Sequence, residues 1–496
     1  MTCHEPARRL IVRRTLADGR QVVAGTLAQN RDGVYFAYDP AYLQAHGNLS
    51  PYHLRADGSV QAAPLDLPHR LHGVFADSLP DGWGMLLQDR HFRQQGIPPA
   101  QITALDRLAY IGDRAIGALN YEPARQPQAV TDNRDYAALG LAAQAIYDGE
   151  TENILQELLR VGSSGGARPK AQIWMTPGDP HHCRTVAQPG DEAWLVKYTS
   201  RHIQPLGHEE GLCEAACLQL AERAGLEPCA WRLLPAPAQS GASHWLALKR
   251  FDCTAQGRYH LHSASGLLHA DYRLPSLDYS DLLKMSKQLC RAAAVGQLQF
   301  ARALFNLLLA NHDDHGKNWA FLQDDCGNWQ PAPFYDATYS PHPRGEHMTA
   351  FGGYGKAPPL KTMQQLAVQA SFARWPDAQK NIQRIADTAA SFSDTALALG
   401  VKKPPCATSS ATSTTSGRKT GICWRNPAPE KEKPPGRGGF FFCSYRRYCN
   451  RSGVSPVSIW PMMRASSPWI FRVAMTASAS SGGTMRMKPM PMLKVP

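Results

Sequence analysis

Residues 303–322 read ALFNLLLANHDDHGKNWAFL, and they decide the fold: an apolar helical run enters a polar loop at 311–318 and leaves it as a strand-like run. Within the loop, Asp313 and Asn318 have the D-x-x-x-x-N spacing of a kinase catalytic loop. In such loops the aspartate takes the proton of the attacking hydroxyl and the asparagine holds Mg²⁺. Lys317 lies between them, where an ammonium group can offset charge on a transferring phosphate. The spacing therefore predicts Asp313 and Lys317 as catalytic residues and Asn318 as a metal ligand.

An aspartate and an asparagine at this spacing also occur in ordinary polar loops, where they cap helices or form turns. The residues that follow favour the catalytic interpretation. Beyond a predicted hairpin at 319–330, the run PAPFYDATY at 331–339 predicts an apolar strand that delivers Asp336 at its end. A carboxylate in such a place suits the metal ion that bridges nucleotide phosphates. Asp336 is therefore predicted as the second metal ligand.

Upstream, the run AWLVKY at 193–198 places Lys197 on an apolar strand. A charged group is costly there unless it is paired or exposed. A nucleotide phosphate and a carboxylate from the next predicted helix would pair it. Glu210 and Glu214 share a face of that helix at spacing i,i+4, and Glu214 is the predicted partner. An edge-strand lysine that points to solvent is the alternative.

A glycine-rich segment, VGSSGGARPKAQI at 161–173, connects a predicted helix to a predicted strand. It matches neither the P-loop pattern nor the kinase pattern G-x-G-x-x-G. The backbone amides of its central residues can still form a phosphate-binding nest, with a nearby cation adding positive charge. The residues predicted for this role are Ser164, Gly165, Gly166 and Lys170, with Arg168 as an alternative cation. A flexible turn between two elements is the competing interpretation.

The rest of the chain predicts an α+β fold with two lobes, strand-rich in the N-terminal part and mainly helical in the C-terminal lobe. Strand-like runs occur at 10–14, 21–27, 33–38 and 245–251, and two runs within 171–197 predict a hairpin. Helical patterns occur at 85–94, 136–161, 209–224, 281–310 and 360–399. The predicted organisation is an N-terminal subdomain at 1–125, a lobe with the glycine-rich loop at 126–250, a helical lobe at 251–400 and a tail at 401–496.

The net charge of +12 is unevenly distributed along the 496 residues. Residues 401–496 contain 16 Lys and Arg but only two acidic residues, whereas residues 1–400 contain 37 basic and 39 acidic residues. The tail is rich in Ser, Thr, Pro and Met and shows no sustained periodicity, so we expect it to be unstructured or foreign to the fold, as an out-of-frame extension would be. A nucleic-acid-binding arm is the alternative.

Composition also excludes several classes of protein. The 12 cysteines are scattered without a C-x-x-C pair, which argues against a disulfide framework and a zinc ribbon. No run approaches the roughly 18 to 20 apolar residues of a membrane span, and no apolar segment follows the basic start of the chain. We therefore expect a cytoplasmic protein with no membrane partner.

In this order, the motifs resemble those of the HipA family of bacterial type II toxin serine/threonine kinases. The resemblance covers about residues 10–395. It is carried by LPDGWG at 79–84, SSGGARPK at 163–170, WLVKY at 194–198, LAERAGL at 220–226, LKRFD at 248–252, FNLLLANHDDHGKN at 305–318 and PFYDATY at 333–339. The last two motifs are specific, and the others are individually weak.

The resemblance implies an ATP- and Mg²⁺-dependent protein kinase with a protein-kinase-like fold. It implies Asp313 as the catalytic aspartate, Asn318 and Asp336 as Mg²⁺ ligands and Lys197 as the phosphate lysine. It also implies that Lys249 and Phe251 lie in the strand and hinge that contact adenine, and that Ser163 is autophosphorylated, with Ser164 as an adjacent rival. A phosphate at Ser163 would bring about −1.5 to −2 charges into a loop built for ATP phosphates and so inhibit the enzyme.

The resemblance further implies a protein substrate among translation components, such as an aminoacyl-tRNA synthetase. It also implies a helix-turn-helix antitoxin, through which DNA would be contacted only indirectly. Two features depart from the usual family pattern. Asp314 adjoins the predicted base, so only the offset to Asn318 selects Asp313, and ARPK at 167–170 replaces the more usual AQ-x-K.

Two other functions remain open at this point. His312, Asp313, Asp314 and His315 could be metal ligands of a phosphohydrolase. That function does not explain why Lys197, Asn318 and Asp336 follow one another in kinase order. The chain could also be an inactive scaffold that binds a transcriptional antitoxin.

Overall fold

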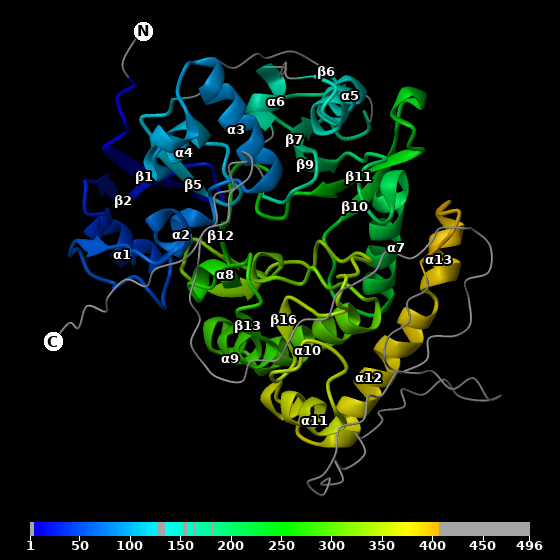
Figure 1. Cartoon of the computed structure of the whole chain (residues 1–496). Coiled ribbons are helices and arrows are strands. Elements are labelled where there is room, and N and C mark those ends of the chain that lie inside the picture. Colours follow the sequence, from blue (N-terminus) through cyan, green and yellow to red (C-terminus); the bar gives the residue numbers. More distant parts are fainter. Residues whose placement is uncertain (1–3, 126–133, 152–155, 162–164, 180–181, 406–496) are drawn as a thin grey trace, which may run out of the picture. The chain divides into compact units, whose positions relative to one another are not determined.

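The chain divides into two compact units, residues 1–430 and 431–496. A computed structural model describes residues 4–125, 134–151, 156–161, 165–179 and 182–405, all of which belong to the first unit (Figure 1). Within these described residues, no helix combines the length and the apolar character needed to cross a membrane.

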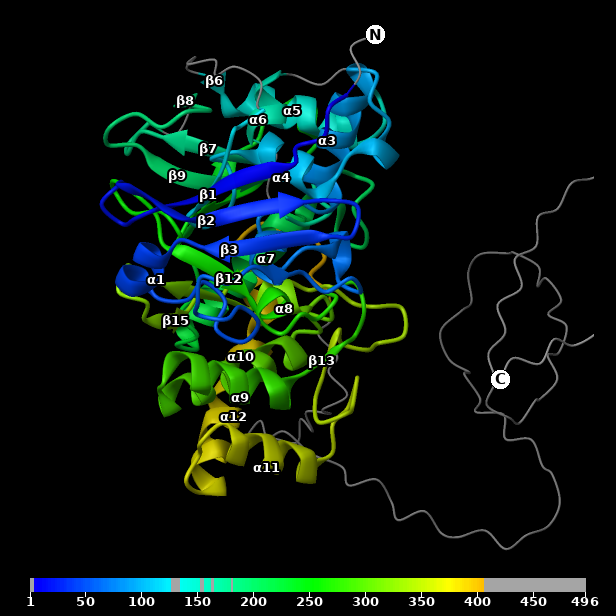
Figure 2. The ribbon, with the colours of Figure 1, turned by 90° about the vertical axis from the view of Figure 1, so that its left-hand side faces the viewer.

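An antiparallel sheet of five strands forms the N-terminal part, in the order β4-β3-β2-β1-β5 (Figure 2). In β1, side chains alternate between a buried and a more exposed face, so that Leu10, Val12 and Arg14 are buried while their neighbours are more exposed. The three strands predicted before residue 40 are confirmed as β1, β2 and β3. The strands are β1 Arg9–Thr15, β2 Gln21–Gln29, β3 Val34–Tyr38, β4 Gln61–Ala62 and β5 Leu119–Glu122.

Four α-helices lie between the strands of this part: α1 Pro40–His46, α2 Gly73–Ala76, α3 Gly82–Gln94 and α4 Ala104–Ile111. Helix α4 begins with a capping box, in which Thr103 and Asp106 each satisfy a backbone amide of the other. Helix α3 contains the stretch predicted at 85–94. Its Trp83 and Leu87 pack against the core of the second sheet, so this helix connects the N-terminal part to the next one.

The second sheet has four antiparallel strands in the order β10-β11-β9-β7. The hairpin predicted within 171–197 is confirmed, because β7 pairs with β9 and Lys170 lies opposite Lys197. The strands are β7 Lys170–Met175, β9 Glu192–Lys197, β10 Trp231–Pro235 and β11 His244–Lys249, beside a small pair of β6 Arg134–Asp135 and β8 His182–Cys183.

Helices around this sheet are α5 Tyr136–Tyr147, α6 Gln156–Val161 and α7 Glu210–Arg223. The helix predicted at 209–224 is α7, and its Cys213 and Cys217 are buried. The single helical stretch predicted at 136–161 is wrong. Helix α5 ends at Tyr147, and Gly149 follows with φ of 76°. A glycine in this left-handed region ends a helix, because it accepts a conformation that side chains disfavour.

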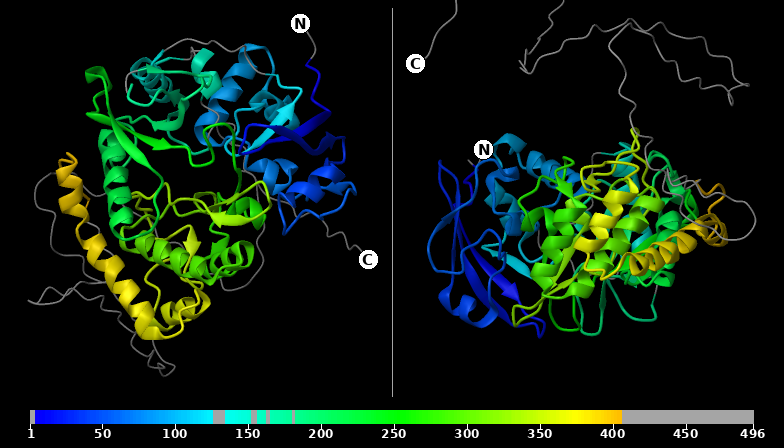
Figure 3. Two further views of the ribbon diagram at one scale, coloured as in Figure 1. Left: turned by 180° about the vertical axis from the view of Figure 1, so that it is seen from behind. Right: turned by 90° about the horizontal axis from the view of Figure 1, so that it is seen from below.

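The C-terminal region is mainly helical. Its helices are α8 Ala264–Leu267, α9 Tyr279–Cys290, α10 Ala293–Leu308, α11 Leu360–Gln369, α12 Trp375–Ala390 and α13 Phe392–Ala398. Helix α12 contacts α10, and α13 contacts α7 (Figure 3). A large apolar core fills this region, with Phe300, Leu304 and Phe305 of α10 at its centre.

Short strands complete the C-terminal region: β12 His260–Ser263, β13 Leu277–Asp278, β14 Ala320–Gln323, β15 Trp329–Pro331 and β16 Thr349–Ala350. The hairpin predicted at 319–330 is confirmed as β14 and β15, to which β12 adds a third strand. The strand predicted to lead into Asp336 is wrong. In its place, Phe334 makes an isolated parallel bridge to Pro228, since the prolines at 331 and 333 lack the amide hydrogens that a continuous ladder needs.

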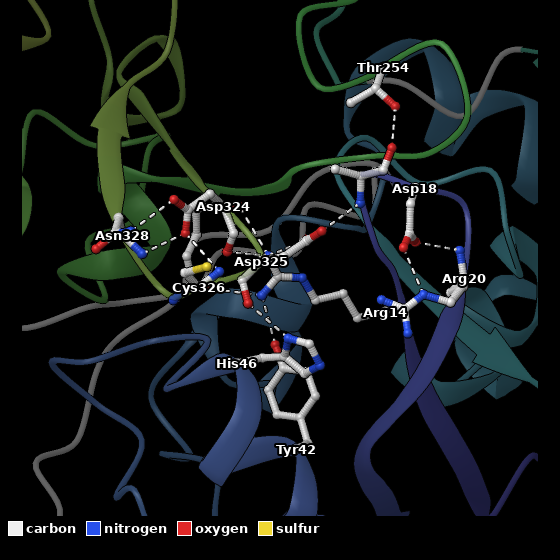
Figure 4. Close-up of polar contacts among 12 residues, drawn as sticks. Arg14, Asp18, Arg20, Tyr42, His46, Thr254, Asp324, Asp325, Cys326 and Asn328 are labelled. Carbon is white, nitrogen blue, oxygen red and sulfur yellow. Dashed lines mark hydrogen bonds and ion pairs between the residues drawn. The ribbon is translucent and has the colours of Figure 1, made fainter.

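Arg14 of β1 ties the N-terminal sheet to the turn between β14 and β15 (Figure 4). Its guanidinium is fully buried and donates to Tyr42 Oη at 2.9 Å, to Gln323 Oε1 at 2.9 Å and to the carbonyl oxygen of Asp324 at 2.7 Å. Asp325 lies 3.6 Å away and offsets part of the buried charge. Because buried charges need such partners, this contact holds the two parts in one arrangement.

Candidate active site

One cavity of about 470 Å³ collects the predicted site residues from across the fold. It lies among the N-terminal part, the glycine-rich loop, the second sheet and the loop after α10. The predicted residues that line it are Gly165, Gly166, Lys170, Lys197, Glu214, Lys249, Phe251, Asp313, Lys317, Asn318 and Asp336. Ser163 and Ser164 lie outside the described residues.

Lys197 joins the second sheet to the floor of the cavity. Its Nζ lies 2.6 Å from Glu214 Oε1 and 2.8 Å from Oε2, so the predicted ion pair is present. The same Nζ donates to Asp336 Oδ1. Burial opposes the charge on Lys197, but Asp336 and Glu214 outweigh it and raise the pKa of the lysine. The cavity therefore keeps a permanent cation where strand β9 faces α7.

Glu210, the rejected partner of Lys197, has a separate contact one turn earlier on α7. Its carboxylate pairs with Arg168 of the glycine-rich segment. The two glutamates thus hold different cations, because the helix face they share spans both the strand and the loop. The sequence spacing by itself left both glutamates possible.

Asp313 and Asp314 point into different surroundings. The Asp313 side chain is 60% exposed and lines the cavity, with His315 Nε2 3.7 Å from its Oδ1. The Asp314 side chain is fully buried, where Tyr279 Oη donates to it at 2.6 Å and His347 Nδ1 lies at 2.9 Å. Only Asp313 can therefore meet a ligand.

The walls of the cavity desolvate Asp313 and raise its pKa. The charge of His315 opposes this shift, and the negative charge of Asp336 reinforces it. A carboxylate with a raised pKa is a better proton acceptor than an ordinary one, so the environment suits a general base.

Asn318 and Asp336 fit a magnesium ion bound partly by the protein and partly by phosphate oxygens. Asn318 Nδ2 donates to the carbonyl oxygen of Asp313 at 2.7 Å, which leaves its amide oxygen as the atom for a cation. Burial opposes ionisation of Asp336, but Lys197 and Lys170 lower its pKa to about 2, so its carboxylate is charged. Among the described residues, no group of three or more His, Cys, Asp or Glu side chains could enclose a metal ion by itself.

The backbone at Asp336 has a positive φ of 52°, and the carbonyl oxygen of this residue accepts from Asn311 Nδ2 at 3.2 Å. Positive φ is uncommon for residues with a side chain, and aspartate is one of those that tolerate it best. The carboxylate is therefore positioned by a left-handed turn held by Asn311, and not by the end of a strand.

The glycine-rich loop is held by both of its neighbours. Lys170 Nζ donates to the carbonyl oxygen of Gly165 at 2.7 Å, and the Gly166 amide donates to Asp81. Burial lowers the pKa of Lys170 to about 8, partly opposed by Asp336. Lys170 therefore supplies a weakly held proton and a positive charge beside the loop.

Lys249 is the last residue of strand β11, Phe251 follows two residues later, and both line the cavity. Lys249 Nζ pairs with Glu192 Oε1 at 2.5 Å, and the Phe251 ring lies 5.5 Å from that of Tyr335. The next residues are held firmly, since Arg250 and Asp252 form a buried ion pair at 2.5 Å. An apolar ring and a fixed hinge backbone suit a flat heterocycle.

The cavity is also lined by residues that were given no role from the sequence, among them Asp77 and Asp81 of the N-terminal part, and Tyr272. Asp81 stands in LPDGWG, one of the individually weak motifs of the family resemblance. Lys317 Nζ lies 3.2 Å from Asp81 Oδ2 and 4.3 Å from the centre of the Tyr272 ring. No local pattern signals this contact, because an aspartate at the start of a helix is common and usually caps that helix.

The four residues of the phosphohydrolase alternative do not converge. His312 Nδ1 accepts from the His342 amide at 2.8 Å, Asp314 is engaged in the core, and Asp313 and His315 face the cavity. Adjacent residues of an extended loop point to different sides, so one metal ion cannot reach all four. This geometry counts against the alternative.

Comparison with known proteins places the chain in a family. Residues 18–122 match the family described as the HipA N-terminal domain, and residues 162–395 match the HipA-like C-terminal domain. Together these two matches cover more than half of the chain. No curated protein matches the sequence.

The chain is similar to several solved structures, including the following two. The HipA toxin–antitoxin system of Shewanella oneidensis MR-1, solved with HipB and operator DNA, has 18% sequence identity and a TM-score of 0.58, over 80% of this chain and 92% of that one. The proinflammatory kinase CtkA of Helicobacter pylori has 13% identity and a TM-score of 0.31, over 48% of this chain and 95% of that one. The predicted fold, strand-rich first and helical later, is confirmed, and with both domain types matched in order the chain belongs to the HipA family.

Proposed function

We propose that the protein is an ATP- and Mg²⁺-dependent serine/threonine protein kinase of HipA type. The observation that carries this proposal is the placement of Asp313. Its exposed carboxylate shares one cavity with the charged cluster of Lys197, Glu214 and Asp336, while the adjacent Asp314 is buried in the core. Phosphoryl transfer requires that the groups binding the phosphate donor and the group accepting the hydroxyl proton line the same cavity.

In the proposed reaction, the γ-phosphoryl group passes from ATP to a serine or threonine hydroxyl. The Asp313 carboxylate orients the hydroxyl and accepts its proton, and ADP leaves with the bonding electron pair. Lys197 and Lys317 offset negative charge on the phosphates. Mg²⁺, when bound by Asn318 and Asp336, supplies further neutralisation of that charge.

Lys249 and Phe251 are proposed to bind the adenine side of ATP, and Gly165, Gly166 and Lys170 the phosphates. Ser163 is proposed as an inhibitory autophosphorylation site, with Ser164 as its rival. A phosphate on that loop would compete electrostatically with those of ATP.

The partners are proposed on the same basis. The structure of the Shewanella protein includes HipB and operator DNA, which supports an antitoxin partner and indirect DNA contact for this chain. A translation component such as an aminoacyl-tRNA synthetase is the proposed class of substrate. Incubation with labelled ATP and a cell lysate, followed by identification of the labelled band, would name it.

The test compares the full-length wild type with Asp313→Asn in the presence of labelled ATP and Mg²⁺. We expect the variant to bind ATP with unchanged affinity but to transfer phosphate about 10²- to 10⁴-fold more slowly, because it lacks the proton acceptor. Phosphopeptide mapping of the wild type should locate label at Ser163 or Ser164.

The matched control is Asp281→Asn on α9, whose side chain is 59% exposed and pairs only loosely with Lys284 at 3.8 Å. It should transfer phosphate at the wild-type rate. Equal rates for Asp313→Asn and the wild type would refute the assignment. Release of free phosphate without any labelled protein would instead support a hydrolase.

A further inference from the structure

Asp81 of the N-terminal part touches two loops of the kinase cavity with one carboxylate. Its Oδ1 accepts from the amide of Gly166 in the glycine-rich loop. Its Oδ2 lies 3.2 Å from Nζ of Lys317 in the catalytic loop. The side chains of Asp81 and Lys317 are only 12% and 19% exposed, so this pair is stronger than one at the surface.

The position of Asp81 argues against an ordinary capping role. Asp81 is the N-cap residue of α3, where an aspartate usually accepts from the first amides of its own helix. Its side chain makes no such capping bond. Instead, the carboxylate contacts the two loops and does not cap α3.

The start of α3 is fitted closely to the glycine-rich loop. The Trp83 amide donates to the Gly166 carbonyl oxygen at 3.0 Å, and Trp83 Nε1 donates to the Lys170 carbonyl oxygen at 2.9 Å. Gly82 has a positive φ of 28°, and a Cβ there would lie 2.4 Å from the Cα of Ala167. The loop therefore rests on a fixed surface, from which Asp81 reaches across the cavity.

Lys317 depends on Asp81 for its placement. The Lys317 ammonium also lies 4.3 Å from the centre of the Tyr272 ring, and its carbonyl oxygen accepts from Tyr335 Oη at 2.5 Å. Among these contacts, Asp81 is the one that carries a full opposite charge. Lys317 is followed directly by Asn318, whose amide holds the backbone of Asp313.

We propose that Asp81 is a positioning residue for phosphoryl transfer, by which the N-terminal part holds the glycine-rich loop and the catalytic loop in register. The inference rests on the proposed kinase function. Without the Asp81 carboxylate, the glycine-rich loop and the Lys317 ammonium are no longer held toward one phosphoryl group. Lys197 and the hinge remain in place, so the affinity for ATP should change little.

The test measures kcat and the KM for ATP in full-length Asp81→Asn. Asparagine keeps an acceptor for the Gly166 amide but removes the charge that faces Lys317. We expect kcat to fall by about 10- to 100-fold, as misplacement of about 1 Å at a reacting centre does, while KM changes less than about threefold. Asp81→Ala, which loses both contacts, should fall further.

A double variant separates positioning from a general loss of stability. If Asp81 acts through Lys317, then Asp81→Asn should have little further effect on kcat in a Lys317→Met background. Independent, additive losses would overturn the proposal. So would a decrease in melting temperature of Asp81→Asn large enough to explain the lost activity.

The matched control is Asp89→Asn on the same helix, whose carboxylate pairs with Arg107 at 2.6 Å and does not line the cavity. It should keep the wild-type kcat. Wild-type kcat in Asp81→Asn, beside an active wild type, would overturn this inference alone. Absence of any protein labelling by the wild type would overturn the kinase function and this inference together.

Discussion

The adjacent residues Asp313 and Asp314 have different surroundings, so only one of the two carboxylates is open to a ligand. Asp314 accepts from Tyr279 and from the amides of Met348 and Thr349, at 2.6, 2.9 and 3.2 Å, and so anchors the segment at 348–349 to α9. Asp313 has no such bonds through its carboxylate among the contacts of the described residues and remains open to the cavity. Spacing to Asn318 selected the aspartate that faces the cavity, and its neighbour is buried because residues one apart in an extended segment face opposite sides.

Helical spacing alone does not identify which glutamate of α7 pairs with Lys197. Two glutamates on one face of α7 were both possible partners, and the preference for Glu214 is confirmed by the 2.6 Å contact. Arg168 of the glycine-rich segment pairs with Glu210, and this leaves Glu214 as the partner of Lys197. That competition involves a loop 42 residues away along the chain, and no local pattern contains it.

The first prediction concerns the buried pair of Arg250 and Asp252 behind the hinge. Burial opposes ionisation of Asp252, but Arg250 outweighs it and lowers the pKa of the carboxyl. A lowered pKa means that the pair stabilises the fold above the ordinary aspartate pKa of about 3.9 and loses this effect as the pH falls through the folded value. Asp252→Asn should lower the free energy of unfolding by about 3 to 5 kcal/mol at pH 7, since Arg250 is left unpaired.

Denaturant unfolding of the wild type and of Asp252→Asn between pH 7 and pH 3.5 checks this prediction. The difference in stability should stay constant down to about pH 5 and shrink below about pH 4. Asp271→Asn is the control, because that carboxylate pairs with a largely exposed arginine, Arg273. A difference that grows on acidification would contradict the assignment.

At the scale of elements, local patterns identified those with strong periodicity. Both hairpins, the first three strands and helix α7 were predicted and are confirmed. Two elements were predicted incorrectly. The helix over 136–161 ends at a left-handed glycine, and the strand before Asp336 is reduced to one bridge by its prolines. In both, a backbone restriction outweighed an apolar pattern.

The second prediction concerns the contact between α2 and α8, which joins the N-terminal part to the C-terminal region. A Cβ at Gly73 would lie 2.1 Å from the carbonyl oxygen of Gly266, which is backbone and cannot rotate away. Gly73→Ala should therefore destabilise the protein by about 1 to 3 kcal/mol, the usual range for overpacking. Helix propensity alone predicts the opposite sign, because alanine favours a helix over glycine by about 1 kcal/mol.

Thermal and denaturant unfolding measure this effect. Gly33→Ala is the matched control, since a Cβ there meets only a Leu65 methyl group at 3.6 Å, an ordinary contact. It should leave the free energy of unfolding within about 0.5 kcal/mol of the wild type. A stabilised Gly73→Ala variant would show that the two helices can separate without cost.

At the scale of the molecule, the charge of the chain and its fold belong to different segments. Residues 1–405 contain 39 basic and 39 acidic residues, so the whole surplus of +12 lies in 406–496 and is not needed to explain the cavity. The described fold extends slightly beyond residue 400. Val401 is buried in the core, and the Lys402 amide donates to Glu209 Oε1 at 3.2 Å.

The third prediction is that a chain of residues 1–405 keeps the melting temperature and the phosphotransfer rate of the full chain. A chain of residues 1–399 should lose about 1.5 to 3 kcal/mol, the value of burying a side chain such as Val401. Unfolding and labelled-ATP assays of the three chains check both statements. A destabilised or inactive 1–405 chain would show that residues 406–496 contribute to the fold or to activity.

Short stretches of the chain predict the order of the elements, the spacing of Asp313, Lys317 and Asn318 and the selection of Lys197 and Asp336 as candidates. These are properties of short segments, in which periodicity and offset express which side chains share a face. Only the tertiary structure decided that Asp314 is buried, that Arg168 takes Glu210 and that Asp81 reaches Lys317. Each of these depends on segments far apart along the chain, and the packing of one against another sets which charged groups meet and which are withdrawn from water.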